Sequence, residues 1–147
     1  MSHARSANAV HLANEVRDMT VKYTRLGLAK EGGYTPDPFC VAVPQLGGMG
    51  HHWVNMALVD PVFQPRFPEV MLYAPDANGQ LQLVAVEYIV IDVGQPAPTF
   101  GGQPFDVGGT PVPAPHWSLH VWVHKNNSNG LFTPFNPDVS CPGAPPS

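Results

Sequence analysis

The sequence predicts a small, mainly β protein of the α+β class, with one N-terminal amphipathic helix packed on an antiparallel β-barrel or sandwich. Three observations support this class. Apolar residues recur at helical spacing only within residues 8–31. Beyond residue 36, Pro and Gly separate short segments rich in β-branched and aromatic residues, as in strands. The sequence Asp76-Ala77-Asn78-Gly79 separates two such segments and predicts a hairpin turn.

Length and composition indicate one folded domain, residues 1–147. Hydrophobic residues make up 44% of the chain and charged residues 12%, which argues against disorder. No apolar run reaches the roughly 20 residues of a membrane span. Residues 32–147 carry two basic residues against eight acidic ones, so nucleic-acid binding is not expected. A neutral or cationic small molecule is the expected partner, and the sequence gives no indication of an oligomeric state.

The predicted helix over residues 8–31 has its apolar stripe at Val16, Met19, Tyr23 and Leu26. Gly32-Gly33 would end it. A helix of this kind packs its stripe on a sheet, and we assign it no chemistry.

The predicted β region covers residues 36–141. Its expected strands are residues 53–59, 69–74, 81–91 and 116–124, paired antiparallel. Residues 92–115 are dense in Gly and Pro and are predicted to form a long loop without regular structure, of the kind that serves as a lid or binding loop.

The two cysteines, Cys40 and Cys141, suggest a disulfide that closes a loop of about 100 residues and contributes up to roughly 4–5 kcal/mol. The alternative is two unrelated thiols. A disulfide would place the protein outside the cytoplasm, secreted or periplasmic. Because Met1-Ser2-His3-Ala4-Arg5 lacks the apolar core of a signal peptide, an export signal would already have been removed.

Histidines carry the main functional signal. In the strand expected over residues 116–124, alternation places His116, His120, Trp122 and His124 on one face. Such a face is either solvated or lines a cavity, and Trp122 among the histidines favours the cavity.

In the strand expected over residues 81–91, alternation puts Glu87 on one face with Leu83, Ala85 and Ile89. The other face is also apolar, so Glu87 is expected to be buried. A buried carboxylate needs a partner. Only Arg66 and Lys125 are basic in the β region, so histidines or a metal ion are favoured over an ordinary ion pair or a protonated carboxyl.

A histidine pair, His51-His52, follows three closely spaced glycines, Gly47, Gly48 and Gly50, which permit a sharp turn toward the site. Neighbouring strand residues point to opposite faces, so only one histidine of the pair faces the site. We favour His52, with His51 and Trp53 on the other face and His51 at the surface or just outside the ligand set.

Six segments resemble a family of small bacterial proteins, often exported, that has no assigned function: Gly-Met-Gly-His-His-Trp-Val-Asn (48–55), Pro-Glu-Val-Met-Leu-Tyr (68–73), Val-Glu-Tyr (86–88), Gly-Gln-Pro-Phe (102–105), His-Trp-Ser-Leu-His-Val-Trp (116–122) and Phe-Asn-Pro-Asp-Val-Ser-Cys (135–141). The resemblance covers most of residues 34–141. It implies export and supports His52 rather than His51, together with Glu87, His116, His120, Cys40 and Cys141. It implies no reaction.

The ligand set is also similar to that of cupins, small β-barrel metalloproteins that use three histidines and a glutamate. Here the histidines His51 and His52 are adjacent, and Glu87 lies on a separate hairpin, so the cupin spacing is absent. Only the ligand types and a cupin-like shape carry over.

Two functions follow from these residues. In the first, His52, Glu87, His116 and His120 bind a divalent transition metal, and an open coordination position supports oxidoreductase or hydrolase chemistry on a small organic molecule. Copper or zinc is favoured, with iron, manganese or nickel as alternatives. His51, Trp53, Trp122 and His124 would then surround the site.

In the second function, the protein is a non-catalytic, disulfide-stapled module whose aromatic residues line a pocket for a small ligand: Trp53, Phe100, Phe105, Trp117 and Trp122. Serine-hydrolase and phosphate-binding motifs are absent from the sequence.

Overall fold

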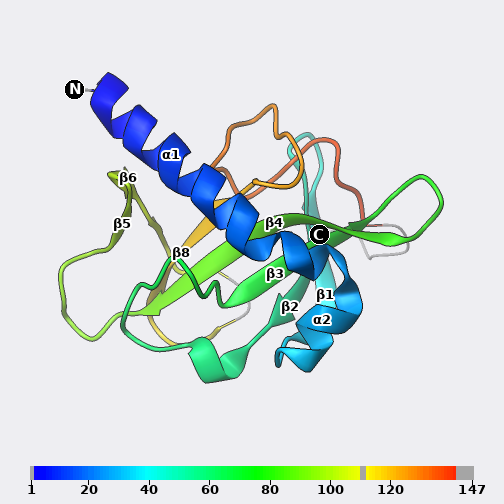
Figure 1. Cartoon of the computed structure of the whole chain (residues 1–147), viewed down its shortest axis with the longest axis horizontal. Coiled ribbons are helices and arrows are strands. Elements are labelled where there is room, and N and C mark those ends of the chain that lie inside the picture. The colour runs from blue at the N-terminus through cyan, green and yellow to red at the C-terminus, as the bar shows by residue number, and fades with distance from the viewer. Residues whose placement is uncertain (1, 110–111, 142–147) are drawn as a thin grey trace.

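A helical segment lies on one face of a six-stranded antiparallel sheet in the computed structural model, which describes residues 2–109 and 112–141 (Figure 1). The helical elements are α1 (Ser2–Thr20), the 3-10 helix η1 (Val21–Thr24), α2 (Leu26–Glu31) and the 3-10 helix η2 (Met56–Leu58). The strands are β1 (Thr35–Val43), β2 (Gly47–Val54), β3 (Val70–Pro75), β4 (Leu81–Ile91), β5 (Thr99–Phe100), β6 (Gln103–Pro104), β7 (Asp106–Val107) and β8 (His116–Val121).

The sheet has the order β1-β2-β3-β4-β8-β7, and β5 and β6 form a separate two-stranded ribbon. Every neighbouring pair is antiparallel. The α+β class is confirmed. The sheet is not closed into a barrel, because β1 and β7 are edge strands in the part of the chain that the structure describes. The open, sandwich-like packing of the helix on the sheet agrees with the sandwich that the sequence predicted as the alternative to a barrel.

The predicted helix is present but interrupted. Thr20 donates its hydroxyl hydrogen to the Val16 carbonyl at 2.8 Å, and β-branched residues follow it. Such back-bonding and crowding weaken a helix at this point, where α1 gives way to η1. Gly32 is the C-terminal cap of α2, so the predicted end is confirmed.

Strand prediction succeeded in the central hairpin and failed at its neighbours. β4 has the predicted bounds. In the predicted turn, residues 76–79, the Gly79 amide donates a hydrogen bond to the Asp76 carbonyl oxygen at 3.0 Å. β2 starts at Gly47 and ends at Val54, so the predicted start at Trp53 is wrong. The glycines taken for a turn belong to the strand and pair with β1.

β1 was missed because Pro36 and Pro38 lie inside it. Proline is tolerated on an edge strand, where one side of the backbone needs no partner. The expectation that residues 92–115 contain no regular element is also wrong, since β5, β6 and β7 lie there. All three are two residues long, too short for a periodic signal.

The sheet separates two apolar clusters. The helix-side cluster includes Ala9, Ala13 and Val16 of α1, packed on alternate residues of the sheet such as Tyr73 and Tyr88. The opposite cluster includes Val54, Val70, Leu72, Ala85 and Ile89. A bulge pairs Leu72 with Ala85 but Tyr73 with Leu83, so Leu83 turns to the helix side and Val84 to the other. The expectation that Leu83 shares the face of Glu87 is therefore wrong, whereas Ala85 and Ile89 do share it.

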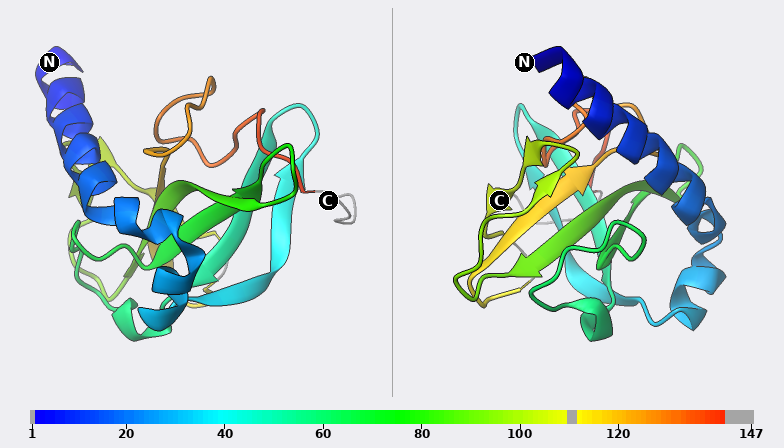
Figure 2. Two further views of the ribbon diagram at one scale, coloured as in Figure 1. Left: turned by 45° about the vertical axis from the view of Figure 1, so that its right-hand side comes forward. Right: turned by 60° about the vertical axis from the view of Figure 1, so that its left-hand side comes forward.

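Residues 131–141, here named the C-terminal strap, start on the helix side, where Phe132 lies against Phe100, and continue to the opposite face of the sheet (Figure 2). Val139 of the strap is buried there, and Asn136 forms a bridge with Gly48. The predicted disulfide between Cys40 and Cys141 is present and ties the strap to β1. Among the described residues, no helix has the length and apolar character needed to cross a bilayer.

Candidate metal centre

Three strands bring His52, Glu87 and His120 together on the face opposite the helix. Glu87 of β4 lies directly opposite His120 of β8 in the ladder. β3 lies between β2 and β4, and its Leu72 pairs with His52 while its Val70 pairs with Glu87. The side chain of His52 therefore approaches Glu87 across β3. The site is therefore built on regular strands, which hold side chains more rigidly than loops do.

The geometry of these three residues suits one metal ion. His52 Nε2 lies 3.1 Å and His120 Nε2 3.4 Å from Glu87 Oε1. One potential ligand atom from each residue lies within 4.8 Å of the other two. Ligands bonded at about 2.0–2.2 Å to a common ion are separated by distances of this order. His52 and Glu87 are 0% exposed and His120 4% exposed.

Among the described residues, none of these buried groups finds a hydrogen-bond partner. Both ring nitrogens of His52 and of His120 and both carboxylate oxygens of Glu87 are buried without a hydrogen-bond partner. The short contacts to Glu87 Oε1 lack hydrogen-bond geometry. A buried polar group left unpaired costs roughly 1–3 kcal/mol, and more when it is charged. One unpaired atom from each of the three residues converges on one point, and an ion is the partner that imidazole and carboxylate share.

The protonation states match those of metal ligands. Burial alone would raise the pKa of Glu87, but the neighbouring imidazoles of His120 and His52, with a smaller effect from His116, hold it below its usual value. Burial lowers the pKa of His120, although the charge of Glu87 opposes this effect. An ionised carboxylate and a neutral imidazole are the forms that bind a cation.

His116, the fourth predicted ligand, is buried on the same face but lies outside this group of three. It is four residues from His120 on one strand, which corresponds to about 13 Å between Cα atoms. Its Nδ1 lies 2.6 Å from the Ala114 carbonyl oxygen, and its Nε2 is buried without a partner. Its part in metal binding remains a prediction.

The alternation at the histidine pair agrees with the prediction. His52 faces the metal group, and Trp53 packs in the helix-side cluster against Tyr73. His51, partly buried, pairs with Cys40 of β1. Gly48 has a different role from the one expected: a Cβ there would lie 2.9 Å from the Val139 carbonyl oxygen, so glycine lets the strap pass close to β2.

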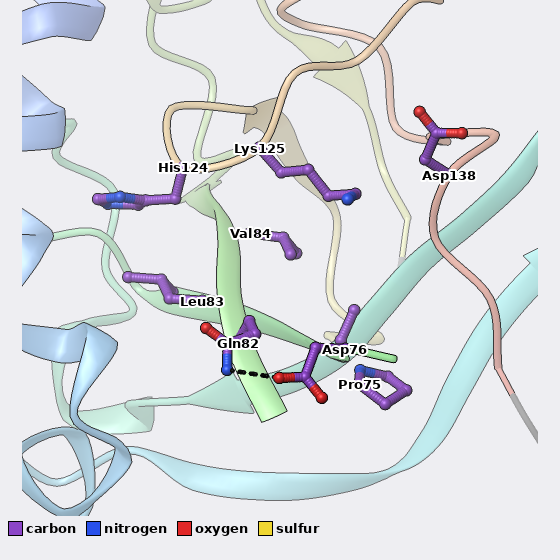
Figure 3. Close-up of a pocket in the computed structure, with 9 residues that line it drawn as sticks. Pro75, Asp76, Gln82, Leu83, Val84, His124, Lys125 and Asp138 are labelled. Carbon is purple, nitrogen blue, oxygen red and sulfur yellow. Dashed lines mark hydrogen bonds between the residues drawn. The ribbon is translucent and has the colours of Figure 1, made fainter. Parts of the chain in front are cut away.

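His124 does not share the face of His116 and His120, and that expectation is wrong. β8 ends at Val121. The Val123 amide donates a hydrogen bond to the Val121 carbonyl, and this tight turn breaks the strand alternation. His124 Nε2 instead lies 2.8 Å from the Thr20 hydroxyl of α1. Figure 3 shows its ring directed away from Lys125 and Asp138, which line the same cavity of about 250 Å³.

Trp122, by contrast, packs in the apolar cluster on the metal side, as expected. Its Nε1 donates to the Thr133 carbonyl at 2.6 Å, so its indole anchors the first part of the strap.

Asp106 was not predicted to belong to the site. It lies on β7 opposite Ser118, the residue between His116 and His120, and therefore on the metal side of the sheet. The residue is exposed, and the partial burial of its carboxyl raises the pKa, while the charge of His120 lowers the pKa and that of Glu87 raises it. No sequence signal identified it, because β7 is only two residues long.

No protein-family model matches this chain, and comparison with curated proteins and with solved structures gives no significant match. The candidate function therefore depends on the geometry of the site.

Proposed function

We propose that this protein binds one divalent transition metal ion through His52, Glu87 and His120. The observation that carries the proposal is the convergence of buried imidazole and carboxylate atoms that have no hydrogen-bond partner in the described part of the chain. Two imidazoles and one carboxylate suit zinc, copper, iron, manganese or nickel, and the general affinity order favours copper or zinc.

Three protein ligands leave at least one coordination position free, which is the arrangement of catalytic rather than structural metal sites. We propose that the ion supports oxidoreductase chemistry on a small organic molecule, where it would supply Lewis-acid or redox reactivity. The residues of the chain would hold the ion in neutral-imidazole and carboxylate form and exclude bulk water, since all three are buried.

The alternative function, a ligand-binding module with an aromatic pocket, has less support. Four of its five aromatic residues pack on the helix side, namely Trp53, Phe100, Phe105 and Trp117. Trp122 packs on the other side of the sheet. Rings divided between two faces do not line one pocket.

An extracytoplasmic location is part of the proposal. The disulfide between Cys40 and Cys141 is compatible with an oxidising compartment. Membership of the family of small exported bacterial proteins, suggested by the sequence segments, has the same implication and is likewise a proposal.

The test is the metal content of untagged protein, measured by inductively coupled plasma mass spectrometry after incubation with each metal and dialysis. We expect about one ion per chain in the wild type. Glu87→Gln and His52→Asn should lower metal affinity by more than about 10-fold, because each removes one of the three ligands, and Glu87→Gln also removes the negative charge that attracts the ion.

His51→Asn is the matched control, because it changes the adjacent histidine on the opposite face of the same strand. It should retain the wild-type metal content. A wild type that takes up none of zinc, copper, iron, manganese or nickel would exclude the metal site, and equal losses in His51→Asn and His52→Asn would exclude the assigned ligands.

A further inference from the structure

Asp106 lies on the metal side of the sheet, at the edge next to His120. β7 pairs with β8 so that Asp106 is opposite Ser118, two residues from His120. Phe105, the residue before Asp106, packs in the helix-side cluster, so strand alternation turns Asp106 to the other side. From the β7 edge inward, the polar side chains of β7, β8, β4 and β2 on this face therefore follow the order Asp106, His120, Glu87 and His52.

This edge is the side of the metal group that lies nearest to solvent. His52 and Glu87 are 0% exposed, whereas His120 is 4% exposed, and Asp106 beside it is exposed. The electrostatics agree with this placement. Burial lowers the pKa of His120, while the charges of Glu87 and of Asp106 oppose that effect. Because such interactions weaken with distance, Asp106 lies close enough to act on an ion held by His120.

A bound divalent cation would leave positive charge unbalanced inside the protein. Glu87 neutralises one of its two charges, and the neutral imidazoles neutralise none. A buried charge without a counter-charge is costly. Glu69 also acts on Glu87, but burial raises its pKa to about 8, so it is protonated at neutral pH. Asp106 is exposed, and water keeps its carboxylate ionised. Of these two acids, Asp106 is therefore the one that supplies a second negative charge.

We propose that Asp106 attracts the divalent cation to the solvent side of the metal group and balances the charge of the bound ion, without being one of its ligands. The inference rests on the proposed metal site and deepens it, because it names how the ion is taken up. Asp106 is not among the three residues whose ligand atoms converge, so its charge acts through space. Salt screens an interaction of this kind near the surface, whereas it does not break a bond to a ligand.

Four variants test the role of the charge. Asp106→Asn and Asp106→Ser both remove it, and Asp106→Glu retains it. Asp18→Asn is the matched control, because it makes the same charge change at an exposed position of α1, on the other side of the sheet. Since Asp106 is exposed on a two-residue edge strand, we expect all four variants to fold, and thermal unfolding checks this.

The probe is Co²⁺, and its visible absorption reports both binding and the ligand set. Titration gives the Kd, and stopped-flow mixing gives the association rate. Measurements at about 0.01 M and about 1 M ionic strength compare screening lengths of about 30 Å and about 3 Å. At low salt we expect Asp106→Asn and Asp106→Ser to weaken Co²⁺ binding about 3- to 10-fold, mainly through slower association. At high salt the difference from wild type should fall below about 2-fold. Asp106→Glu should stay near wild type, and all the bound spectra should be alike.

The inference would be overturned by either of two results. A loss of affinity that persists at high salt, together with a changed Co²⁺ spectrum, would make Asp106 a ligand. A loss at low salt no larger than that of Asp18→Asn would mean that the position of the charge is unimportant. Failure of the wild type to bind Co²⁺ would instead overturn the proposed metal site, and the inference would fall with it.

Discussion

Two buried glutamates, Glu69 and Glu87, have opposite electrostatic environments. Histidines surround Glu87 and hold its pKa below the usual value. Burial raises the pKa of Glu69 to about 8, and the charges of Asp60 and Glu87 add to the rise, although a hydrogen bond from the Ile89 amide at 2.9 Å opposes it. Glu69 is therefore a protonated structural acid at neutral pH, whereas Glu87 is an ionised candidate ligand.

Glu69 should make stability fall as pH rises. Its pKa in the folded state, about 8, exceeds the ordinary value of 4.5, so its stabilising contribution is complete below pH 4.5 and is lost as pH rises through 8. Glu69→Gln keeps an acceptor for the Ile89 amide and cannot ionise. We expect the variant to gain stability relative to the wild type with increasing pH, by roughly 4 kcal/mol between pH 4.5 and pH 9.

Urea unfolding at several pH values in the presence of a chelator measures this difference. Glu31→Gln, at the exposed end of α2, is the control and should show no such trend. A difference between Glu69→Gln and the wild type that stays constant from pH 4.5 to pH 9 would contradict the assignment.

At the residue level, sequence reasoning identified Glu87 because a carboxylate in an apolar run is chemically unusual. Strand alternation was sufficient to select His52 over His51. The same rule failed for His124, because a turn after Val121 interrupts the alternation. It also failed for Leu83, where a bulge in β4 shifts the register by one residue. Both irregularities arise from pairing with distant segments, which local sequence does not specify.

Among the elements, the contact between α1 and the β5–β6 ribbon depends on one glycine. Gly101 has φ +56, and a Cβ at this position would lie 2.8 Å from both the Cα and the N of Ala9 in α1. The ribbon can touch the helix backbone only because no side chain intervenes. This contact adds to the packing of Ala9, Ala13 and Val16 on the sheet.

Gly101→Ala should displace α1 from the ribbon and lower the free energy of unfolding by about 1–3 kcal/mol, the usual cost of overpacking. Gly79→Ala provides the comparison, because Gly79 also has positive φ, at +80, but has nothing within 4 Å of the added Cβ. It should show only the smaller conformational cost, about 1 kcal/mol. Equal losses in chemical denaturation would mean that the helix contact contributes nothing.

Element prediction succeeded where hydrophobic pattern and turn chemistry agreed, as in the β3–β4 hairpin. It failed for β1, whose prolines are acceptable only because the strand lies at an edge. Whether a strand is central or at an edge is a property of the assembled sheet. For the same reason the sequence allowed a closed barrel, whereas the structure leaves β1 and β7 as edges in the described part of the chain.

On the scale of the whole molecule, the disulfide holds the C-terminal strap against the metal side of the sheet. It joins Cys40 and Cys141, which are 101 residues apart. The strap adds buried contacts of its own, since Val139 is 3% exposed and Asn136 is fully buried. Replacing both cysteines by serine should lower the free energy of unfolding by about 2–5 kcal/mol, as measured by urea denaturation against the oxidised wild type. A loss below about 1 kcal/mol would mean that the strap holds its place without the bond.

The strap also links the redox state of the protein to its proposed metal ion. The disulfide joins Cys141 to Cys40 of β1, and Cys40 pairs with His51, the neighbour of His52 in β2. Val139 of the strap packs in the same apolar cluster as Leu72, which pairs with His52. Reduction of the disulfide should therefore loosen the surroundings of His52 and speed the exchange of bound metal with an isotope of the same metal. Equal exchange rates in the oxidised and the reduced protein would mean that the strap does not restrain the site.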